Sequence, residues 1–410
     1  MNLHRAEFSR LLLGFFAFAV STMSLCAAET SAAPRATPAQ TKPESAFTPI
    51  VASVTAPPIP VRATDGRIHL AYELVLINTL AQPVTINAVR ARAGDRTLQE
   101  LAGDTLPAWF RALGSTAPAH VLGPGQSGFV WIDATVDEPA RVPSRIQNVI
   151  DIEVAKPSLP LIPKSMSEIV AETPVQARDA VVIAPPLRGQ RWLDGDGCCA
   201  LTAHRGAVNP INGAFWGAER FAIDFVRLDD KGRMFTGDKS KFESYPYYGV
   251  EVHAVADGRV VAVVGDRPEQ TPGASPTGLK LDEYGGNYVV QDIGNHNYAF
   301  YAHLQTGSNT ARIRIGQELK SGDVVGLLGN SGNSDAPHLH FHVMSGTDPL
   351  ASNGVPFRFH SFELNSRLAS AAELDRLSSG ASAVNGPNES SGKRTDEMPL
   401  GLDVVTFPER

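Results

Sequence analysis

The stretch that decides the fold and the chemistry of this chain is Gly329-Asn-Ser-Gly-Asn-Ser-Asp-Ala-Pro-His338-Leu-His340-Phe-His342-Val343. Its first half is rich in turn-forming residues, and its second half alternates imidazoles with apolar residues, which predicts a loop leading into a β-strand. Because side chains alternate faces along a strand, we expect His338, His340 and His342 on one face and the apolar residues in the core. Imidazole is the commonest protein metal ligand, so this face is a candidate metal site.

The composition of the whole chain favours an all-β protein of two domains. The 410 residues include 30 Pro and 36 Gly, and 43% are hydrophobic, which predicts many short strands separated by turns. The chain carries 36 basic and 43 acidic residues, a net charge of −7, and no basic run. A phosphate backbone would not be attracted to such a chain, so we expect no nucleic-acid partner.

The N-terminus has the features of an export signal. Arg5 and Arg10 precede an apolar run, Leu11–Val20, and small residues stand at Cys26 and Ala28. This order predicts a signal peptide over residues 1–28 and an exported protein, periplasmic or secreted. The apolar run is too short to span a bilayer, and no later run reaches ~18 apolar residues, so we expect no stable membrane span. The residues before Cys26 fit a lipid-attachment site poorly.

The remaining chain divides by composition into four parts. Residues 29–46, rich in Ala, Thr and Pro, predict a disordered linker. In residues 47–175, β-rich runs alternate with turn signals, which predicts an immunoglobulin-like β-sandwich, although the paired cysteines of antibody domains are missing. Residues 180–362 predict a second, β-sheet domain. Residues 363–410 are expected to form a partly disordered C-terminal tail, with Leu402–Phe407 as an edge strand.

Three features of the second domain predict local structure. The pair Asp257-Gly258 lies between apolar runs, so Val250–Val264 is expected to form a β-hairpin. Two long polar insertions, Asp229–Tyr245 and Asp266–Tyr284, exceed simple hairpin loops. Such insertions either form the walls of a substrate groove or are exposed and disordered.

Three short motifs in the second domain resemble those of a known enzyme family. The Pro-His338-Leu-His340-Phe run, with Tyr301-Ala-His303-Leu304 and Phe221-Ala-Ile-Asp224-Phe225, resembles the catalytic core of lysostaphin/LytM-type zinc metallopeptidases over roughly residues 185–360. The resemblance implies a LytM-type, duplicated-hybrid-motif-like β-sheet domain with Zn²⁺ as cofactor. It also implies an endopeptidase that hydrolyses peptidoglycan cross-links or stem peptides through a metal-activated water. On this resemblance Asp224 and His340 are metal ligands, while His303 and His338 are catalytic residues that handle the proton and stabilise the oxyanion.

One metal ligand of that family is missing from its expected place. The family has a histidine four residues before the aspartate, and this chain has Arg220 there. A guanidinium has no lone pair to offer a metal, and a catalytic zinc needs three protein ligands. The nearest upstream histidine is His204, which we predict to be the third ligand. A two-residue turn at Asn212-Gly213 would aim His204 away from Asp224, unless a bulge shifts the register of the strands by one residue.

Other residues compete with His204 for this role. His342 lies one strand repeat beyond His340, and Cys199 lies five residues before His204. The adjacent Cys198 and Cys199 are the only cysteines after the signal, and they could instead form a vicinal disulfide or stay as buried thiols.

Three functions follow from these alternatives. The first is a zinc endopeptidase acting on peptidoglycan. The second, supported by the substitution at Arg220, is a non-catalytic LytM-like module that binds peptidoglycan or activates a cell-wall amidase partner. The third is a sugar-phosphotransferase carrier, which uses paired histidines on a related fold. The export signal excludes the third, because an exported chain cannot serve a cytoplasmic phosphorelay.

Overall fold

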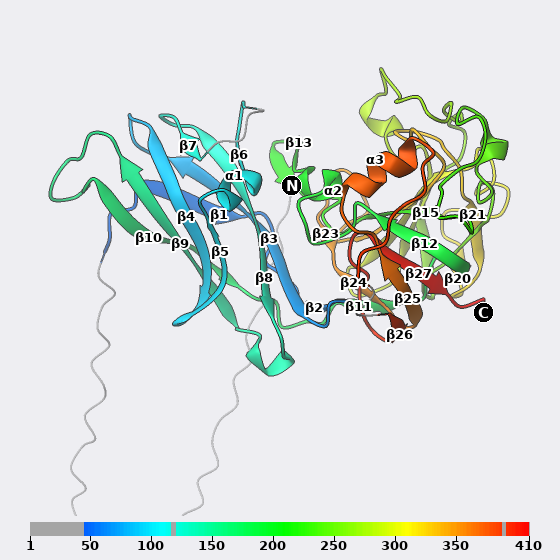
Figure 1. The fold of residues 1–410 in the computed structure, drawn as a ribbon, viewed down its shortest axis with the longest axis horizontal. Helices are drawn as coiled ribbons and strands as arrows, with labels where there is room; N and C mark the ends of the chain where they lie inside the picture. Colours follow the sequence, from blue (N-terminus) through cyan, green and yellow to red (C-terminus); the bar gives the residue numbers. More distant parts are fainter. Residues whose placement is uncertain (1–44, 116–119, 388–390, 410) are drawn as a thin grey trace, which may run out of the picture. The chain divides into compact units, whose positions relative to one another are not determined.

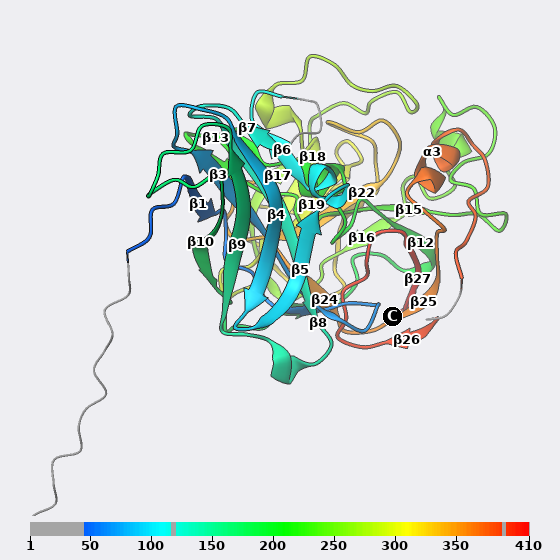
Figure 2. The same cartoon turned by 60° about the vertical axis from the view of Figure 1, so that its left-hand side comes forward.

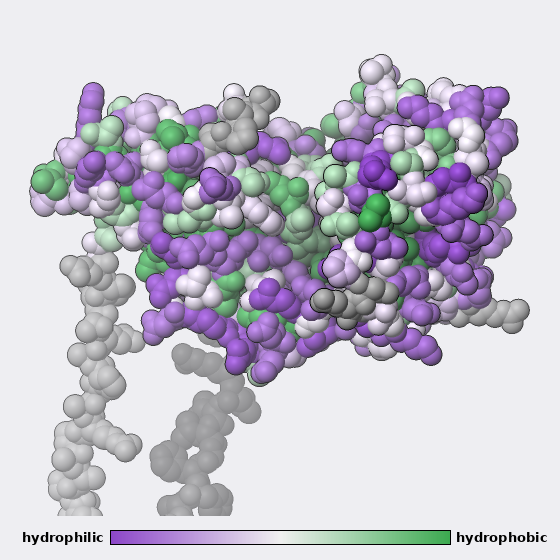
Figure 3. All heavy atoms as spheres, viewed as in Figure 1, coloured by the Kyte–Doolittle hydropathy of each residue, from purple (hydrophilic) through white to green (hydrophobic). Residues whose placement is uncertain are grey.

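The computed structural model describes residues 45–115, 120–387 and 391–409. From Phe47 onward the chain forms one compact unit. The predicted signal peptide, Cys26 and nearly all of the predicted linker lie outside the described residues. In the described part, no helix is long and apolar enough to cross a membrane. The face of the molecule in Figure 3 is covered mainly by hydrophilic residues, with hydrophobic ones in smaller patches between them.

Two antiparallel sheets form the first part of the unit. The first sheet contains β1 (Ile50–Val54), β2 (Val61–Arg62), β3 (Ile68–Asn78), β6 (Phe110–Ala112) and β8 (Ser127–Val136). The second contains β4 (Val84–Ala93), β5 (Arg96–Ala102), β7 (Val121–Leu122), β9 (Arg145–Val154) and β10 (Ser165–Pro174), in the order β10-β9-β4-β5 with β7 on β4, which can be followed in Figure 2. The short α1 (Thr105–Ala108) and a 3₁₀ turn, Pro139–Arg141, lie in the connections.

The two sheets enclose a single apolar core. Leu74 and Val130 from the first sheet and Ile86 and Ile150 from the second are all fully buried in one cluster. Buried residues alternate with less buried ones along most of β9, as expected of a strand with one face in a core. This arrangement agrees with the predicted sandwich, and its immunoglobulin-like connectivity stays a prediction.

One large sheet dominates the rest of the unit (Figure 1). Its described strands follow the order β20-β17-β18-β19-β22-β15-β12-β27-β25-β26, with β23 paired to β22. Of these strands, β15, β12, β27 and β25 are labelled in Figure 1. They are β12 (Gly189–Gly195), β15 (Ile223–Arg227), β17 (Gly258–Val264), β18 (Asn287–Asp292), β19 (Tyr298–Leu304), β20 (Glu318–Leu319), β22 (Leu339–Met344), β23 (Gly354–Val355), β25 (Phe362–Arg367), β26 (Gly392–Arg394) and β27 (Asp403–Phe407).

Smaller elements connect these strands. They are the paired β11 (Val181–Ile183) and β24 (Phe357–Phe359), β13 (Asn209–Ile211) and β14 (Ala214–Trp216), β16 (Glu251–His253) and β21 (Val324–Leu327), the helices α2 (Ala203–Gly206) and α3 (Ala372–Ser378), and the 3₁₀ turns Phe242–Ser244 and Leu281–Glu283. The chain is therefore mostly β, as its composition predicts.

Strand β22 lies in the middle of the large sheet, between β19 and β15. Leu339, Phe341 and Val343 are fully buried in the core, as the alternating pattern predicts. Register pairs Asp224 of β15 with His340 of β22. Directly paired residues share a face, so this register brings the carboxylate and the imidazole together.

The hairpin predicted around Asp257-Gly258 does not form. Strand β16 pairs with β21 in a separate small sheet, whereas β17 pairs with β18 and β20. The Asp257 carboxylate instead accepts hydrogen bonds from Lys320 Nζ (2.8 Å) and the Ser321 amide (3.0 Å). Contacts to a segment distant in sequence therefore replace the local hairpin.

The large sheet continues beyond the predicted domain boundary at residue 362. Strands β25, β26 and β27 all belong to it, and β27 lies between β12 and β25 rather than at an edge. The predicted edge strand is thus an interior strand. Its apolar residues Val404, Val405 and Phe407 are buried, which gives this segment a core to join.

Candidate metal centre

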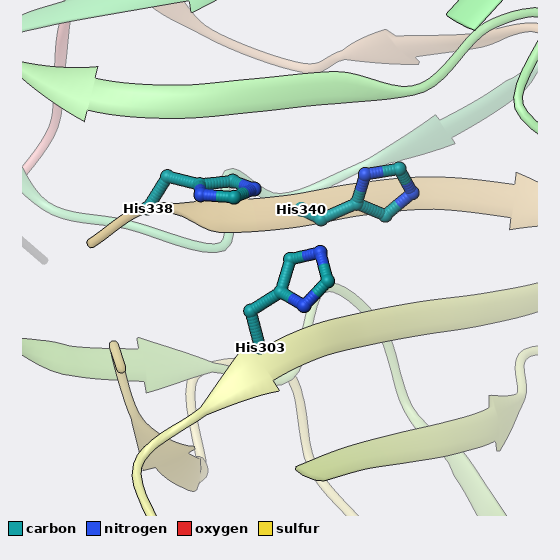
Figure 4. A group of neighbouring side chains, drawn as sticks. All are labelled: His303, His338 and His340. Atoms are coloured by element: carbon teal, nitrogen blue, oxygen red, sulfur yellow. The ribbon is translucent and has the colours of Figure 1, made fainter. Parts of the chain in front are cut away.

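The five residues predicted for the site converge at one end of strands β15, β19 and β22. Figure 4 shows the rings of His303, His338 and His340 lying close together, with His338 just before β22 and His303 at the end of β19. His303 has a positive φ of 59°, a conformation that non-glycine residues adopt infrequently. Its backbone conformation turns the chain at the point where the imidazole enters the site.

His204 joins this group from a helical turn. A strand at His204 that pairs with the strand of Asp224 was predicted, and this was wrong, because residues Ala203–Gly206 form α2. The turn at Asn212-Gly213 does form, between β13 and β14, but this short hairpin begins after His204 and does not set its direction. Thr202 caps the helix by accepting a hydrogen bond from the Arg205 amide.

Three donors of this group meet in a geometry that suits a metal ion. His204 Nε2 lies 3.3 Å from one oxygen of Asp224, and His340 Nδ1 lies 2.8 Å from the other. All three ligand atoms are within 4.8 Å of one another. Tetrahedral zinc with ligand distances of about 2.0 to 2.2 Å separates its donors by about 3 to 4 Å. Two imidazoles and a carboxylate therefore fit a zinc ion.

The outer nitrogen of each ligand imidazole has a partner. His204 Nδ1 lies 3.1 Å from the carbonyl oxygen of Ala222, which can only accept, so Nδ1 carries a proton, and the neutral imidazole would offer the lone pair of Nε2 to a metal. His340 Nε2 lies 2.9 Å from His342 Nδ1. A proton on His340 Nε2, donated to His342, leaves the Nδ1 lone pair facing Asp224. Such partners fix the tautomer and orientation of metal-binding histidines.

His303 and His338 are held by backbone carbonyls. His303 Nδ1 donates to the carbonyl of Ser331 (2.7 Å), and His338 Nδ1 donates to that of Ala336 (2.8 Å). Their ring centroids are 4.7 Å apart. The Nε2 atoms are thereby left for the site. His303, His338 and His340 also bring three nitrogens within 4.8 Å of one another, so the donors alone allow a second ligand set that shares His340.

Burial and the Asp224 carboxylate displace the pKa values of this group in different directions. Burial favours the neutral acid of Asp224, but the neighbouring His204 and His338 outweigh it and hold its pKa well below the usual range. Burial, together with His338 and His340, lowers the pKa of His303 far below that of free imidazole. Burial also opposes charge on His338, but Asp224 raises its pKa. At neutral pH His303 is therefore a neutral acceptor.

The site opens into a groove with a volume of about 440 Å³. The insertion Asp266–Tyr284 contributes to its wall, as one of the two sequence alternatives proposed, whereas the insertion Asp229–Tyr245 does not line it. Tyr284, Tyr288 and Phe300 give the groove aromatic surface. Its acidic residues, apart from Asp224, are Asp196, Glu219, Asp282, Asp335 and Asp348.

Two residues named as competing ligands have other roles in the structure. Cys198 and Cys199 form a disulfide bond, so Cys199 offers no thiolate. His342 is buried and contacts His340, and its Nε2 has no hydrogen-bond partner among the described residues. The sequence analysis missed its role as a partner of His340, although the His-x-His-x-His alternation placed both imidazoles on one face.

Arg220 points away from the centre. Its guanidinium is almost fully buried and makes an ion pair with Glu73 of β3 at 2.8 Å. The position that holds a ligand in the resembling family therefore contacts the first sheet of this chain instead.

The chain matches known proteins over part of its length. Residues 244–352 match the model of Peptidase family M23. Endolysin 2638A of Staphylococcus phage 2638A is 31% identical over 140 residues, 30% of this chain and 28% of that protein. The peptidoglycan DD-endopeptidase ShyA of Vibrio cholerae is 33% identical over 103 residues, 23% of this chain and 22% of that protein. The match thus spans less than a third of either relative.

Among solved structures, the catalytic domain of the antimicrobial peptidase lysostaphin from Staphylococcus simulans aligns with 40% of this chain and 88% of its own length, at 21% identity and a TM-score of 0.22. The family match includes His303, His338 and His340, and it begins downstream of His204 and Asp224. Residues 244–352 of this chain are thus similar to the domain of Peptidase family M23.

Proposed function

We propose that this protein is a zinc-dependent endopeptidase that hydrolyses peptide bonds of bacterial peptidoglycan outside the cytoplasm. The observation that carries this proposal is the convergence of His204 Nε2, the Asp224 carboxylate and His340 Nδ1 at spacings that suit one zinc ion. The M23 domain and relatives named as endopeptidases support the class of reaction.

Each residue of the centre has a distinct task in this proposal. His204, Asp224 and His340 would hold the ion, which supplies Lewis-acid chemistry by polarising a carbonyl and activating water. His303, neutral and anchored at Nδ1, offers Nε2 as a proton acceptor. His338, with its raised pKa, is a donor that can stabilise the negative charge developing on the scissile carbonyl.

The groove fits a polymer better than a compact ligand. Aromatic side chains and parts of the segments 275–288 and 333–335 line it beside His303, His338 and His340. An extended peptide can lie there with one carbonyl over the metal centre. We therefore propose peptide cross-links or stem peptides of peptidoglycan as substrate.

The alternative is a non-catalytic module that binds peptidoglycan or activates an amidase. Its sequence support was the loss of a ligand at Arg220. In the structure, His204 Nε2 lies 3.3 Å from the Asp224 carboxylate, a spacing that suits two ligands of one zinc ion, while Arg220 makes an ion pair with Glu73. These contacts favour the catalytic proposal, and the alternative becomes one outcome of the test.

The test combines metal content with activity. Mass spectrometry of purified protein should find one zinc per chain, and isolated cell-wall sacculi should release soluble peptides. His340→Ala should lose both. A wild-type protein that contains no zinc and cleaves no sacculi, yet still sediments with them, would establish the non-catalytic alternative.

The assignment of the third ligand needs a second pair of variants. His204→Ala should empty the metal site, because Asp224 and His340 alone give only two ligands. Arg220→Ala should keep one zinc per chain at saturating metal, because its guanidinium does not face the centre. If His204→Ala retains zinc, the third ligand is instead His303 or His338.

A further inference from the structure

A buried cluster of three charged residues joins β3 to the metal centre. The Glu73 carboxylate of β3 lies 3.2 Å from Arg205 Nε through one oxygen and 2.8 Å from Arg220 Nη1 through the other. Glu73 is 0% exposed, Arg205 1% and Arg220 3%, so the cluster has almost no contact with solvent. Thr55 Oγ1 also donates to Glu73, at 2.8 Å.

Both arginines also bind carbonyls of the first sheet. Arg205 Nη2 donates to Ile132 of β8 at 2.8 Å, and Arg220 Nη2 donates to Ala71 of β3 at 3.3 Å. Each guanidinium is thus fixed by the sheet at more than one point. The five donors of a guanidinium form a rigid fork, so several contacts define its position closely.

The two arginines belong to the two segments that supply His204 and Asp224. Arg205 follows His204 directly in α2, and Arg220 lies four residues before Asp224, in the turn that leads into β15. The segments also meet at the centre, where His204 Nδ1 donates to the carbonyl of Ala222. One carboxylate on β3 therefore contacts both segments. Its partner follows His204 in one segment and precedes Asp224 in the other.

The cost of burying these charges indicates that the cluster orients the two segments and is not needed merely to hold them against the first sheet. Burying two guanidiniums and one carboxylate costs desolvation free energy, and apolar side chains of similar volume can hold two surfaces together without this cost. Burial opposes ionisation of Glu73, but Arg220 and Arg205 outweigh it and keep its pKa below the usual value. What the ionised cluster adds is a fixed distance and orientation between the segments it contacts.

We propose that Glu73 is a positioning residue of the metal centre, which fixes His204 relative to Asp224 through Arg205 and Arg220. The first sheet then completes the centre, although it contributes no ligand. This inference rests on the proposed zinc site. It also accounts for Arg220, because the position that lost a ligand became the anchor of the segment that holds Asp224.

The test is the isosteric substitution Glu73→Gln in the full chain. Zinc affinity is measured by competition with a chromophoric chelator, and ligand geometry by the visible absorption of the Co²⁺-substituted protein. We expect zinc affinity to fall about 10- to 100-fold, the usual effect of losing a group that orients a ligand. The cobalt spectrum should change as well, because it reports the number and arrangement of ligands.

Thr64→Val provides a matched control. Thr64 donates a buried hydrogen bond to Asp403 of β27, a contact that also joins the first part of the unit to the large sheet. It touches neither ligand segment, so zinc affinity and the cobalt spectrum should stay as in the wild type. Equal losses of zinc affinity in Thr64→Val and Glu73→Gln would show that the cluster only holds the first part of the unit against the large sheet, and would overturn the proposal.

A second variant keeps the test decisive if Glu73→Gln does not fold. Arg220→Met leaves Glu73 and Arg205 as a neutral pair and retains an apolar stem, so folding is expected. Zinc should bind about 10-fold more weakly, and still stoichiometrically at saturation. If Glu73→Gln folds and keeps the zinc affinity and the cobalt spectrum of the wild type, the positioning role is overturned. If Glu73→Gln does not fold, the same result in Arg220→Met overturns it. Failure of the wild type to bind zinc would instead overturn the proposed function.

Discussion

At the scale of single residues, the division between metal ligands and catalytic groups can be tested directly. His303 and His338 are anchored through Nδ1 to backbone carbonyls. His303→Ala and His338→Ala should each keep one zinc per chain, because three other ligands remain, and lose turnover by about 100-fold or more. Zinc analysis beside sacculus digestion measures both. Stoichiometric loss of zinc in either variant would favour the ligand set made of His303, His338 and His340.

His342 provides a second test at this scale. Its Nδ1 accepts the proton of His340 Nε2 in the ligand tautomer, at 2.9 Å. His342→Leu leaves that buried donor without a partner and should weaken zinc binding about 10- to 100-fold. His342→Gln, whose amide oxygen can accept the same hydrogen bond, should restore most of the affinity. Equal affinity in both variants would show that the hydrogen bond does not orient His340.

The residues that the sequence could predict are those whose direction follows from strand periodicity. Alternation along β22 placed His340 on the face of the site and Phe341 in the core, and the structure agrees. The position of His204 could not be predicted in the same way, because α2 is a single helical turn held by its cap and by contacts with the first sheet. In the positioning role proposed above, the 3.3 Å contact of His204 with Asp224 depends on those distant contacts.

At the scale of secondary-structure elements, β3 carries a pH-dependent contact. His69 Nδ1 lies 3.0 Å from Asp133 of β8, and Nε2 lies 3.2 Å from Asp65. Burial opposes the charge on His69, but the two carboxylates outweigh it and raise its pKa to about 9. The folded pKa exceeds the unfolded value of about 6.5, so this stabilisation is complete below about pH 6.5 and is lost as pH rises through about 9.

Urea denaturation at several pH values measures this effect. Between pH 6.5 and 9.5 the free energy of unfolding should fall by on the order of 3 kcal/mol more in the wild type than in His69→Gln. Asp133→Asn should reduce the difference, because one of the two carboxylates is removed. Parallel pH profiles for the wild type and His69→Gln would contradict the assignment.

Local signals also failed at this scale, and the reason is physical. Asp257-Gly258 is a strong hairpin signal, yet β16 and β17 belong to different sheets. Lys320 and Ser321 bind the Asp257 side chain, and Gly258 pairs with Leu319. Propensity within a few residues cannot register partners that lie some sixty positions away, so tertiary pairing decided the structure here.

At the scale of the whole molecule, the large sheet joins segments from both ends of the second half of the chain. Strand β12 pairs with β15, which carries Asp224, and also with β27 near the C-terminus. The predicted catalytic domain ends at residue 362, because the tail beyond it includes a segment rich in Ser, Gly and Asn, residues 378–393. The short apolar run after that segment is what returns the chain to the sheet.

This topology predicts that the large sheet does not fold in a chain ending at residue 362. Val404, Val405 and Phe407 are at most 4% exposed and pack in the main core, where Phe407 contacts Phe225 with ring centroids 5.6 Å apart. Each buried side chain of this kind contributes about 1.5 to 3 kcal/mol, and a whole domain is stable by only about 5 to 15 kcal/mol. Removal of β27 also exposes the backbone of β12 beside the strand that carries Asp224.

Circular dichroism during heating, with zinc binding as a second measurement, tests this prediction on chains that start at residue 45. The chain ending at 362 should lose the cooperative transition of the large sheet and should bind no stoichiometric zinc. The point variant Phe407→Ala is the matched control, because it keeps the pairing of β27 and should unfold cooperatively with a loss of about 3 to 5 kcal/mol. A shortened chain that melts like the full one would mean that β12 and β15 hold their register without β27. The boundary at 362 would then be that of an independent domain, and pairing with β12 and β22 would set the geometry of Asp224 without β27.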